Sequence, residues 1–226
     1  MVSGKSELQY LTLRQNVVEI IRKKIFIGDY QPGDRVKELE LANDLGISRG
    51  PIREAIRQLE EEGLLNYITN KGCFVTTLDP KDAWEIYLLR ADLEILSLKS
   101  CKGDIGEELI SKMENAYQNM VLASQNNDFN EMVTQDIIFH ECICLASNNK
   151  HLLKLWSNMN GHLYSIFLTV KAANIRPIDE IATRHIHVLD AIKLKDLELA
   201  SERISDHYLA TGLELFNKHM KMLENA

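Results

Sequence analysis

The stretch ISRGPIREAIR, residues 47–57, decides the fold of the first part of the chain. Arg49, Arg53 and Arg57 recur at every fourth position, so they share one side of an α-helix. Apolar residues occupy the other side: Ile52, Ala55, Ile56 and Leu59. Ser48 is a favourable N-cap for this helix. Such a helix can pack on a small domain and offer its cations to DNA, which predicts a recognition helix; the alternative is an ordinary solvated face.

The sequence on either side of this stretch completes a small domain. Periodic apolar residues predict a first helix over Gln15 to Ile27 and a second over Lys37 to Leu45. Gly46 ends the second helix because glycine accepts a positive φ, and the arginine helix then runs to about Glu62. Two short helices joined by a tight, glycine-containing turn predict a helix-turn-helix.

A β-hairpin is expected directly after these helices. Residues 65–69 and 73–77 are rich in β-branched and aromatic side chains, and the sequence NKG at 70–72 is a turn signal. Lys71 and Gly72 at the tip suit close approach to a phosphate backbone or a minor groove. Helix, helix-turn-helix and hairpin in this order predict a winged helix over the first 78 residues.

Charge is distributed unevenly along the chain. The formal net charge of −7 argues against indiscriminate binding to nucleic acid. The first 78 residues hold 11 basic and 11 acidic side chains, so the surplus negative charge lies wholly in the remainder. Cations in the first part are focused on the arginine helix and on Lys71. Focused positive charge is typical of a sequence-selective DNA reader.

Composition sets further bounds on the class of protein. No run of 18 apolar residues occurs and the amino end shows no signal-peptide pattern, so we expect a cytoplasmic protein with no membrane partner. The four cysteines show no Cys-x-x-Cys spacing, which favours reduced thiols over a cysteine metal site.

Residues 79–226 predict a second, all-helical domain. Apolar spacing and polar breaks indicate six helices, at about residues 80–101, 104–126, 128–147, 149–173, 178–194 and 196–222. Short connections favour antiparallel neighbours. The expected fold class is therefore mainly α, with a winged helix-turn-helix and its small β-hairpin wing followed by an antiparallel six-helix bundle.

Four polar residues interrupt the apolar sides of these helices. Asp136 and His140 are four apart on one helix, and His185 and His207 lie on two others. Three imidazoles and one carboxylate are ligands that zinc, nickel and manganese accept, so this set is a candidate divalent-metal site. Each histidine could instead be an ordinary hydrogen-bonded core residue, and His187 competes with His185.

A set of short motifs runs through the first part of the chain. It comprises Pro32-Gly33, Glu38 with Leu41-Ala42, Leu45 to Arg49, Pro51 to Ala55, Leu59-Glu60, Glu62 to Leu65 and Lys71-Gly72. The set resembles the GntR-type transcriptional regulators, which implies that Arg49 and Arg53 contact DNA and that the wing near Gly72 reaches the minor groove. Many members carry a basic residue where Leu39 stands and a threonine where Gly50 stands. We expect DNA contacts from Ser48, Arg49, Gly50, Arg53, Arg57, Lys71 and Gly72.

The helical part carries a second set of motifs. It comprises Arg90 with Glu94, Asp136 with Phe139-His140, Ala146 to Asn149, His185 with Val188 to Ile192, and His207. The set resembles the FCD domain of the FadR-like branch of that family, and six helices suggest its shorter VanR-like subgroup. The resemblance implies a metal held by Asp136, His140, His185 and His207, with a small organic acid beside it. Arg90 is then the candidate partner of the acid's carboxylate; its alternative is a salt bridge to Asp136 or Glu94.

Together these features predict a ligand-responsive regulator that binds a double-stranded DNA operator as a homodimer. We expect a repressor whose affinity for DNA is controlled by a small carboxylate metabolite bound at the metal. Two other interpretations are a regulator that senses the metal ion itself and a metal-dependent hydrolase.

Overall fold

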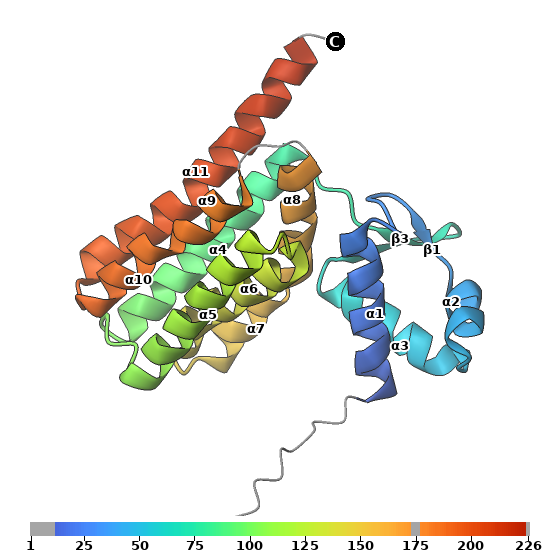
Figure 1. Cartoon of the computed structure of the whole chain (residues 1–226), viewed down its shortest axis with the longest axis horizontal. Coiled ribbons are helices and arrows are strands. Elements are labelled where there is room, and N and C mark those ends of the chain that lie inside the picture. The colour runs from blue at the N-terminus through green and yellow to red at the C-terminus, as the bar shows by residue number, and fades with distance from the viewer. Residues whose placement is uncertain (1–11, 173–176, 225–226) are drawn as a thin grey trace, which may run out of the picture. The chain divides into compact units, whose positions relative to one another are not determined.

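The chain divides into two units in a computed structural model that describes residues 12–172 and 177–224 (Figure 1). The first unit holds Met1–Glu61 and Leu65–Val75, and the second holds Glu62–Leu64 and Thr76–Ala226. The first eleven residues of the expected winged helix and the end of the expected helix 149–173 lie outside the described residues.

The first unit is a winged helix, as the sequence predicts. Its elements are α1 (Leu13–Ile27), β1 (Arg35–Val36), α2 (Glu38–Leu45), α3 (Arg49–Glu61), β2 (Leu65–Ile68) and β3 (Gly72–Val75). Thr12 caps α1 by accepting a hydrogen bond from Gln15 N, which satisfies one of the free amides of the first turn. The apolar side of α3 is buried, with Ile52 and Leu59 fully covered, and this packing leaves the arginine side in solvent.

The wing has three strands rather than the expected two. Its order is β1-β3-β2, and both pairings are antiparallel. Strand β1 was not predicted because its two residues are too few to show the alternation that marks a strand. Val36 is buried in the core while Arg35 is exposed, so the added strand widens the sheet and places one more cation on its surface.

The turn of the helix-turn-helix depends on Gly46. This residue ends α2 with φ +64°, and its N–H reaches the carbonyls of Ala42 and Asn43. A Cβ added at Gly46 would meet nothing within 4 Å. Glycine is therefore required here by backbone conformation and not by lack of space.

The second unit contains eight helices within the described residues, where six were expected. They are α4 (Pro80–Ser100), α5 (Glu107–Gln125), α6 (Phe129–Leu145), α7 (Lys150–Ser157), α8 (Asn160–Ala172), α9 (Ile178–Thr183), α10 (His185–Lys193) and α11 (Leu197–Glu224). The fourth expected helix is broken after Asn158 and the fifth at Arg184. Both residues keep right-handed helical φ and ψ, so the apolar pattern continues through each bend and conceals it.

Long helices form the frame of this unit. α4 begins with Asp79 as N-cap and Pro80 at its first position, and it lies beside α11 (Figure 1). Gly212 permits this close approach, since a Cβ there would lie 2.8 Å from Trp84 Cε3. α6 packs against both α4 and α5, so residues from α4, α6 and α11 meet in the interior. Among the described helices we find none that combines the length and the apolar character needed to cross a membrane.

We expect Gly46→Ala to lower the free energy of unfolding of the first unit by about 1 kcal/mol, because a non-glycine residue must adopt the left-handed conformation. Gly46→Asn should cost less, since asparagine tolerates this conformation better. Hydrogen exchange of the α2 and α3 amides measures both effects. Equal losses for the two variants would contradict this account.

Candidate metal centre and nucleic-acid interface

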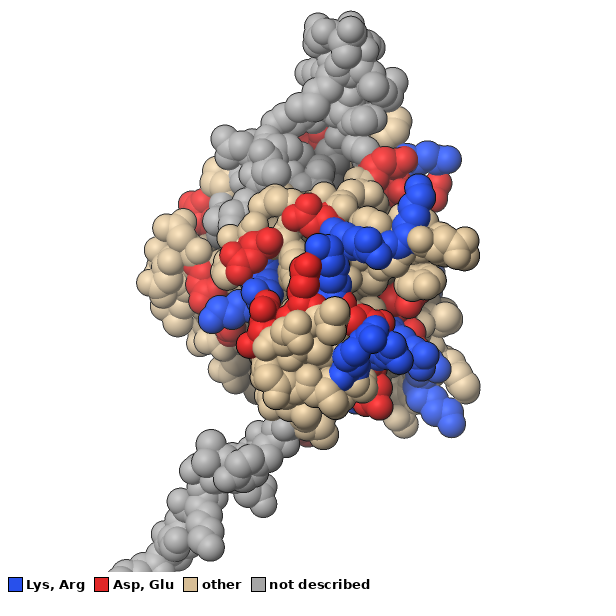
Figure 2. Space-filling view, turned by 90° about the vertical axis from the view of Figure 1, so that its right-hand side faces the viewer, with Lys and Arg blue, Asp and Glu red and all other residues tan. Residues whose placement is uncertain are grey.

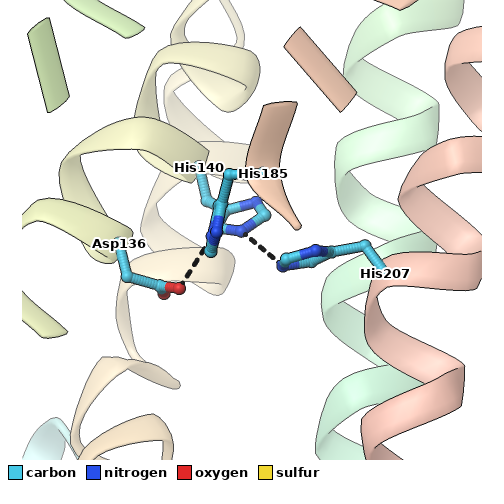
Figure 3. A group of neighbouring side chains, drawn as sticks. All are labelled: Asp136, His140, His185 and His207. Carbon is cyan, nitrogen blue, oxygen red and sulfur yellow. Dashed lines mark hydrogen bonds and ion pairs between the residues drawn. The ribbon is translucent and has the colours of Figure 1, made fainter. Parts of the chain in front are cut away.

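The four predicted metal ligands meet inside the second unit. Asp136 and His140 project from α6, His185 from the start of α10 and His207 from α11, and the four side chains point toward one another (Figure 3). One ligand atom from each lies within 4.8 Å of all the others. The first three residues are buried and His207 is half-buried. His187, the competing histidine, is exposed and stands outside this group.

The spacing of these atoms is close to that of a metal site. Two ligand atoms bonded to one ion at about 2.1 Å can be at most about 4.2 Å apart. His185 Nε2 lies 2.9 Å from Asp136 Oδ1, and His140 Nε2 lies 3.2 Å from His207 Nε2. The group would need to close by only about half an ångström to share one ion.

A hydrogen bond on the outer side of His140, at Nδ1, directs the other ring nitrogen, Nε2, into the site. Nδ1 lies 2.9 Å from Glu94 Oε2, and because a carboxylate accepts, the ring donates from Nδ1. In the neutral ring Nε2 then carries a lone pair, and this atom faces His207. A carboxylate behind a histidine is the arrangement that fixes the tautomer and orientation of metal-binding imidazoles.

His185 is oriented by the backbone in the same way. Its Nδ1 lies 3.1 Å from Ile181 O and 3.2 Å from Ala182 O, so Nδ1 is the donor and Nε2 points at Asp136. Burial by itself raises the pKa of the Asp136 carboxyl, but the hydrogen bond and charge of His185 hold that pKa below its usual value. The carboxylate is therefore ionised and faces an imidazole nitrogen, which requires a cation or a proton between them.

Glu94 is the centre of a buried network that the sequence did not single out as functional. It is fully buried on α4, and its Oε1 accepts hydrogen bonds from Trp156 Nε1 at 2.9 Å and from the Tyr208 hydroxyl at 2.5 Å. Burial and the nearby Glu94 charge raise the pKa of Tyr208 well above its usual value, so the phenol stays a donor. With His140 on Oε2, this one carboxylate joins α4, α6, α7 and α11.

Arg90 supplies the positive charge that accompanies this carboxylate. Its guanidinium is fully buried, stacks 4.1 Å from the Trp156 ring, and donates from Nε to the Tyr208 hydroxyl and from Nη1 to Asn160 Oδ1. Its Nη2 is buried with no hydrogen-bond partner in the described part of the chain. Arg90 forms no direct ion pair with Asp136 or Glu94 among these residues. Burial lowers the pKa of its guanidinium, but Tyr208, Glu94 and Asp136 together hold that pKa above its usual value.

A small cavity opens beside the four ligands. Its volume is about 30 Å³, which is more than a single water molecule requires. The walls are formed by the ligands Asp136, His140, His185 and His207 with Tyr87, Leu163, Phe167, Ile181, Arg184, Tyr208 and Thr211. Arg90 is not part of this wall. Arg184 and Thr211 were missed by the sequence analysis, although the position of Arg184 directly before a candidate ligand could have drawn attention to it.

The arginines of α3 are organised by a single acidic side chain. Arg49 Nη2 and Arg53 Nε each donate to the same atom, Glu38 Oε2, at 2.8 Å. The hydrogen bond from Arg53 is the main reason that the pKa of Glu38 lies below its usual value. Both arginine side chains remain about half exposed, at 52% and 53%, so they are held in place and still accessible.

The other residues predicted to contact DNA lie around these arginines in the first unit. Ser48, Gly50, Arg57 and Lys71 are exposed, and Gly72 is half-buried with φ +105°. Figure 2 shows that basic and acidic side chains alternate on the face it presents, with no uniform positive surface. The exposed cations therefore do not form one continuous basic surface. Their contacts with DNA stay a prediction.

Comparison with known proteins establishes the family. Residues 13–75 match the bacterial regulatory proteins of the gntR family, and residues 85–210 match the FCD domain. An uncharacterized HTH-type transcriptional regulator of Bacillus subtilis, YdhC, is 31% identical over 189 residues, which cover 83% of this chain and 84% of that protein. The chain belongs to the GntR family of regulators and carries an FCD domain. It is therefore a DNA-binding transcriptional regulator.

A further relative agrees with this identification, and a solved structure agrees with the fold. The gluconate operon transcriptional repressor of Bacillus licheniformis is 27% identical over 192 residues, which cover 83% of this chain and 79% of the repressor. The solved structure of E. coli McbR/YncC shares the fold with a TM-score of 0.75 and 20% identity, covering 93% of this chain and all of that chain. The VanR-like subgroup was suggested by a count of six helices, and it stays a prediction.

We expect Glu94→Gln to lower the free energy of unfolding of the second unit by about 3 kcal/mol, because it removes the buried counter-charge of Arg90. It also places an NH₂ group against one of three buried donors. Thermal unfolding measures the loss. The control is Glu85→Gln, an exposed residue of the same helix, which should change stability by less than about 0.5 kcal/mol. Similar effects of the two substitutions would refute the role of this network.

Proposed function

We propose that this GntR-family protein is a repressor whose affinity for its operator is controlled at the Asp136–His140–His185–His207 group. The observation that carries the proposal is the orientation of the imidazoles. Glu94 and two backbone carbonyls occupy the Nδ1 atoms of His140 and His185, so both Nε2 atoms face the same small space. We further propose that it acts in the cytoplasm as a homodimer, reading two half-sites of a pseudo-palindromic operator.

The donor set supports a divalent cation at this group. Three imidazoles and one carboxylate suit zinc, nickel or manganese, whereas a calcium site would need six or more oxygen ligands. When bound, the ion would offer a positively charged coordination partner to an anion in the cavity. The protein residues supply the rest of the site by orienting the imidazoles.

The proposed anion is a small organic acid, and Arg90 is the proposed partner of its carboxylate. The support is the buried Nη2 of Arg90, a donor that is left without a partner in the described residues. Tyr208, which accepts from Arg90 Nε, lines the cavity and connects the two. Because some relatives are named repressors of a gluconate operon, gluconate is the first acid to test.

A regulator that senses the metal ion itself is the second candidate. The observation in its favour is the small size of the cavity, about 30 Å³, whose wall includes all four candidate ligands. The hydrolase interpretation has no support, because the relatives are named transcriptional regulators and repressors.

The deciding experiment measures DNA affinity by fluorescence anisotropy on a duplex enriched from a random pool. We compare metal-free protein, protein loaded with zinc, nickel or manganese, and loaded protein with gluconate or its uncharged analogue sorbitol. An acid-controlled repressor should lose at least about tenfold in DNA affinity when gluconate is added to the metal-loaded protein, and none when sorbitol is added. The ligand must favour one state of the protein over the other. A change on chelation, with none from any acid, would favour the metal sensor.

A pair of histidine variants provides the matched control. His185→Ala should lower metal binding by at least about tenfold and abolish the response to the acid, because it removes one of four ligands. His187→Ala, an exposed histidine two residues away, should bind metal and respond as the wild type does. Equal metal content in the two variants, measured by mass spectrometry, would exclude His185 as a ligand.

We expect Arg53→Ala to weaken binding to the enriched duplex by about tenfold or more and to relax specificity at one base pair, because a base-contacting arginine contributes about 1–3 kcal/mol. Arg203→Ala, which removes the same charge from a partly exposed position of the second unit, is the control and should leave affinity nearly unchanged. Unaltered base preference in Arg53→Ala would exclude Arg53 from base recognition.

A further inference from the structure

The three-stranded wing places an exposed arginine that the sequence analysis did not consider. Arg35 lies in β1 directly opposite Phe74 of β3. Because alternate residues of a strand share a face, Arg35, Gly72 and Phe74 lie on one side of the sheet, opposite the buried side chain of Val36. This side of the sheet is the one that faces solvent near Arg35.

The guanidinium of Arg35 lies over Gly72. Its Nη2 and Nε atoms are 3.1 and 3.2 Å from the point that a Cβ of Gly72 would occupy. Gly72 pairs with Ile68 at the last position of the ladder before the hairpin turn. The side chain of Arg35 therefore extends along the sheet from its own register position to the tip of the wing, where the missing Cβ leaves space for it.

Arg35 differs from the neighbouring cations in its pairing. Arg49 and Arg53 share the Glu38 carboxylate, and Lys37 lies 2.7 Å from Glu40. Within residues 12–172 and 177–224, the side chain of Arg35 forms no hydrogen bond or ion pair, although its backbone pairs with β3. It is thus an exposed cation without an acidic partner among the described residues, as are Arg57 and Lys71, whereas Lys37, Arg49 and Arg53 are held by acidic side chains.

Arg35 also lines the same surface hollow as the arginines of α3. This shallow hollow of about 370 Å³ has Arg35, Arg49, Arg53, Tyr67 and Gly72 among its lining residues, together with Glu38, the shared acid of the two α3 arginines. A duplex that places its major groove on the arginines of α3 brings its backbone and adjacent minor groove to the far side of this hollow. An arginine there meets the strongest negative potential where the minor groove is narrow, as it is over A·T-rich steps.

We propose that Arg35 inserts into the minor groove beside each half-site and selects flanking sequence by groove shape. The proposal rests on the proposed DNA contacts of α3, and it adds a second determinant of specificity that touches no base in the major groove. Gly72 is the residue that allows the guanidinium to reach the tip of the wing.

The test uses the full chain and a duplex enriched from a random pool, rebuilt with three kinds of flank: A·T, G·C and inosine·C. Inosine·C lacks the minor-groove amino group of G·C but presents the same major-groove acceptors. The wild type should prefer both A·T and inosine·C flanks to G·C flanks by about tenfold. Arg35→Ala should reduce this preference to less than about twofold, and Arg35→Lys should retain only part of it.

Lys37→Ala is the matched control, because it removes one exposed positive charge from the same surface. It should weaken binding to all three duplexes by one common factor and leave the preference unchanged. Full preference in Arg35→Ala, or a wild type that treats inosine·C as it treats G·C, would overturn the proposal. A wild type that binds no duplex would refute the proposed DNA contacts of α3 instead. Circular dichroism confirms that each variant is folded.

Discussion

A single buried carboxylate holds the second unit in the arrangement on which its site depends. Glu94 receives hydrogen bonds from His140, Trp156 and Tyr208, which come from three different helices. Each of these donors is buried, and each would lose a favourable partner if the carboxylate were absent. Arg90 lies among the same residues and needs a nearby negative charge to remain buried. The orientation of His140, and hence of the candidate metal centre, follows from this packing.

The first unit uses a carboxylate in a different physical setting. Glu38 also collects two cations, Arg49 and Arg53, but all three side chains are partly exposed to water. Exposed ion pairs contribute little to stability, about 0–1 kcal/mol, and are weakened by salt. The arginines can therefore exchange this partner for DNA at small cost, while the shared acid keeps both guanidiniums at the surface of α3 beforehand. Glu94 is buried, so its partners are costly to separate from it. Glu38 is partly exposed, so DNA can replace it as the partner of the two arginines.

Much of this arrangement could be predicted from sequence, because strong local signals carry it. The turn residues around Gly46 and the apolar side of α3 specify the helix-turn-helix, and both are present. The bends after Asn158 and at Arg184 could not be seen, since residues that stay in the helical region leave no mark in apolar periodicity. A strand as short as β1 has no periodicity at all, so Arg35 was overlooked with it.

The candidate site shows the same division between local and distant signals. Asp136 and His140 stand four apart on one helix, so their common direction follows from the sequence. The role of Glu94 does not, because its partners lie 46, 62 and 114 residues away and only the packing of four helices brings them together. The choice between His185 and His187 likewise depends on which side of α10 faces the core. Residues such as Glu94, whose partners are distant in the sequence, can therefore be recognised only from the structure. In this protein they surround the ligand residues that the sequence motifs detect.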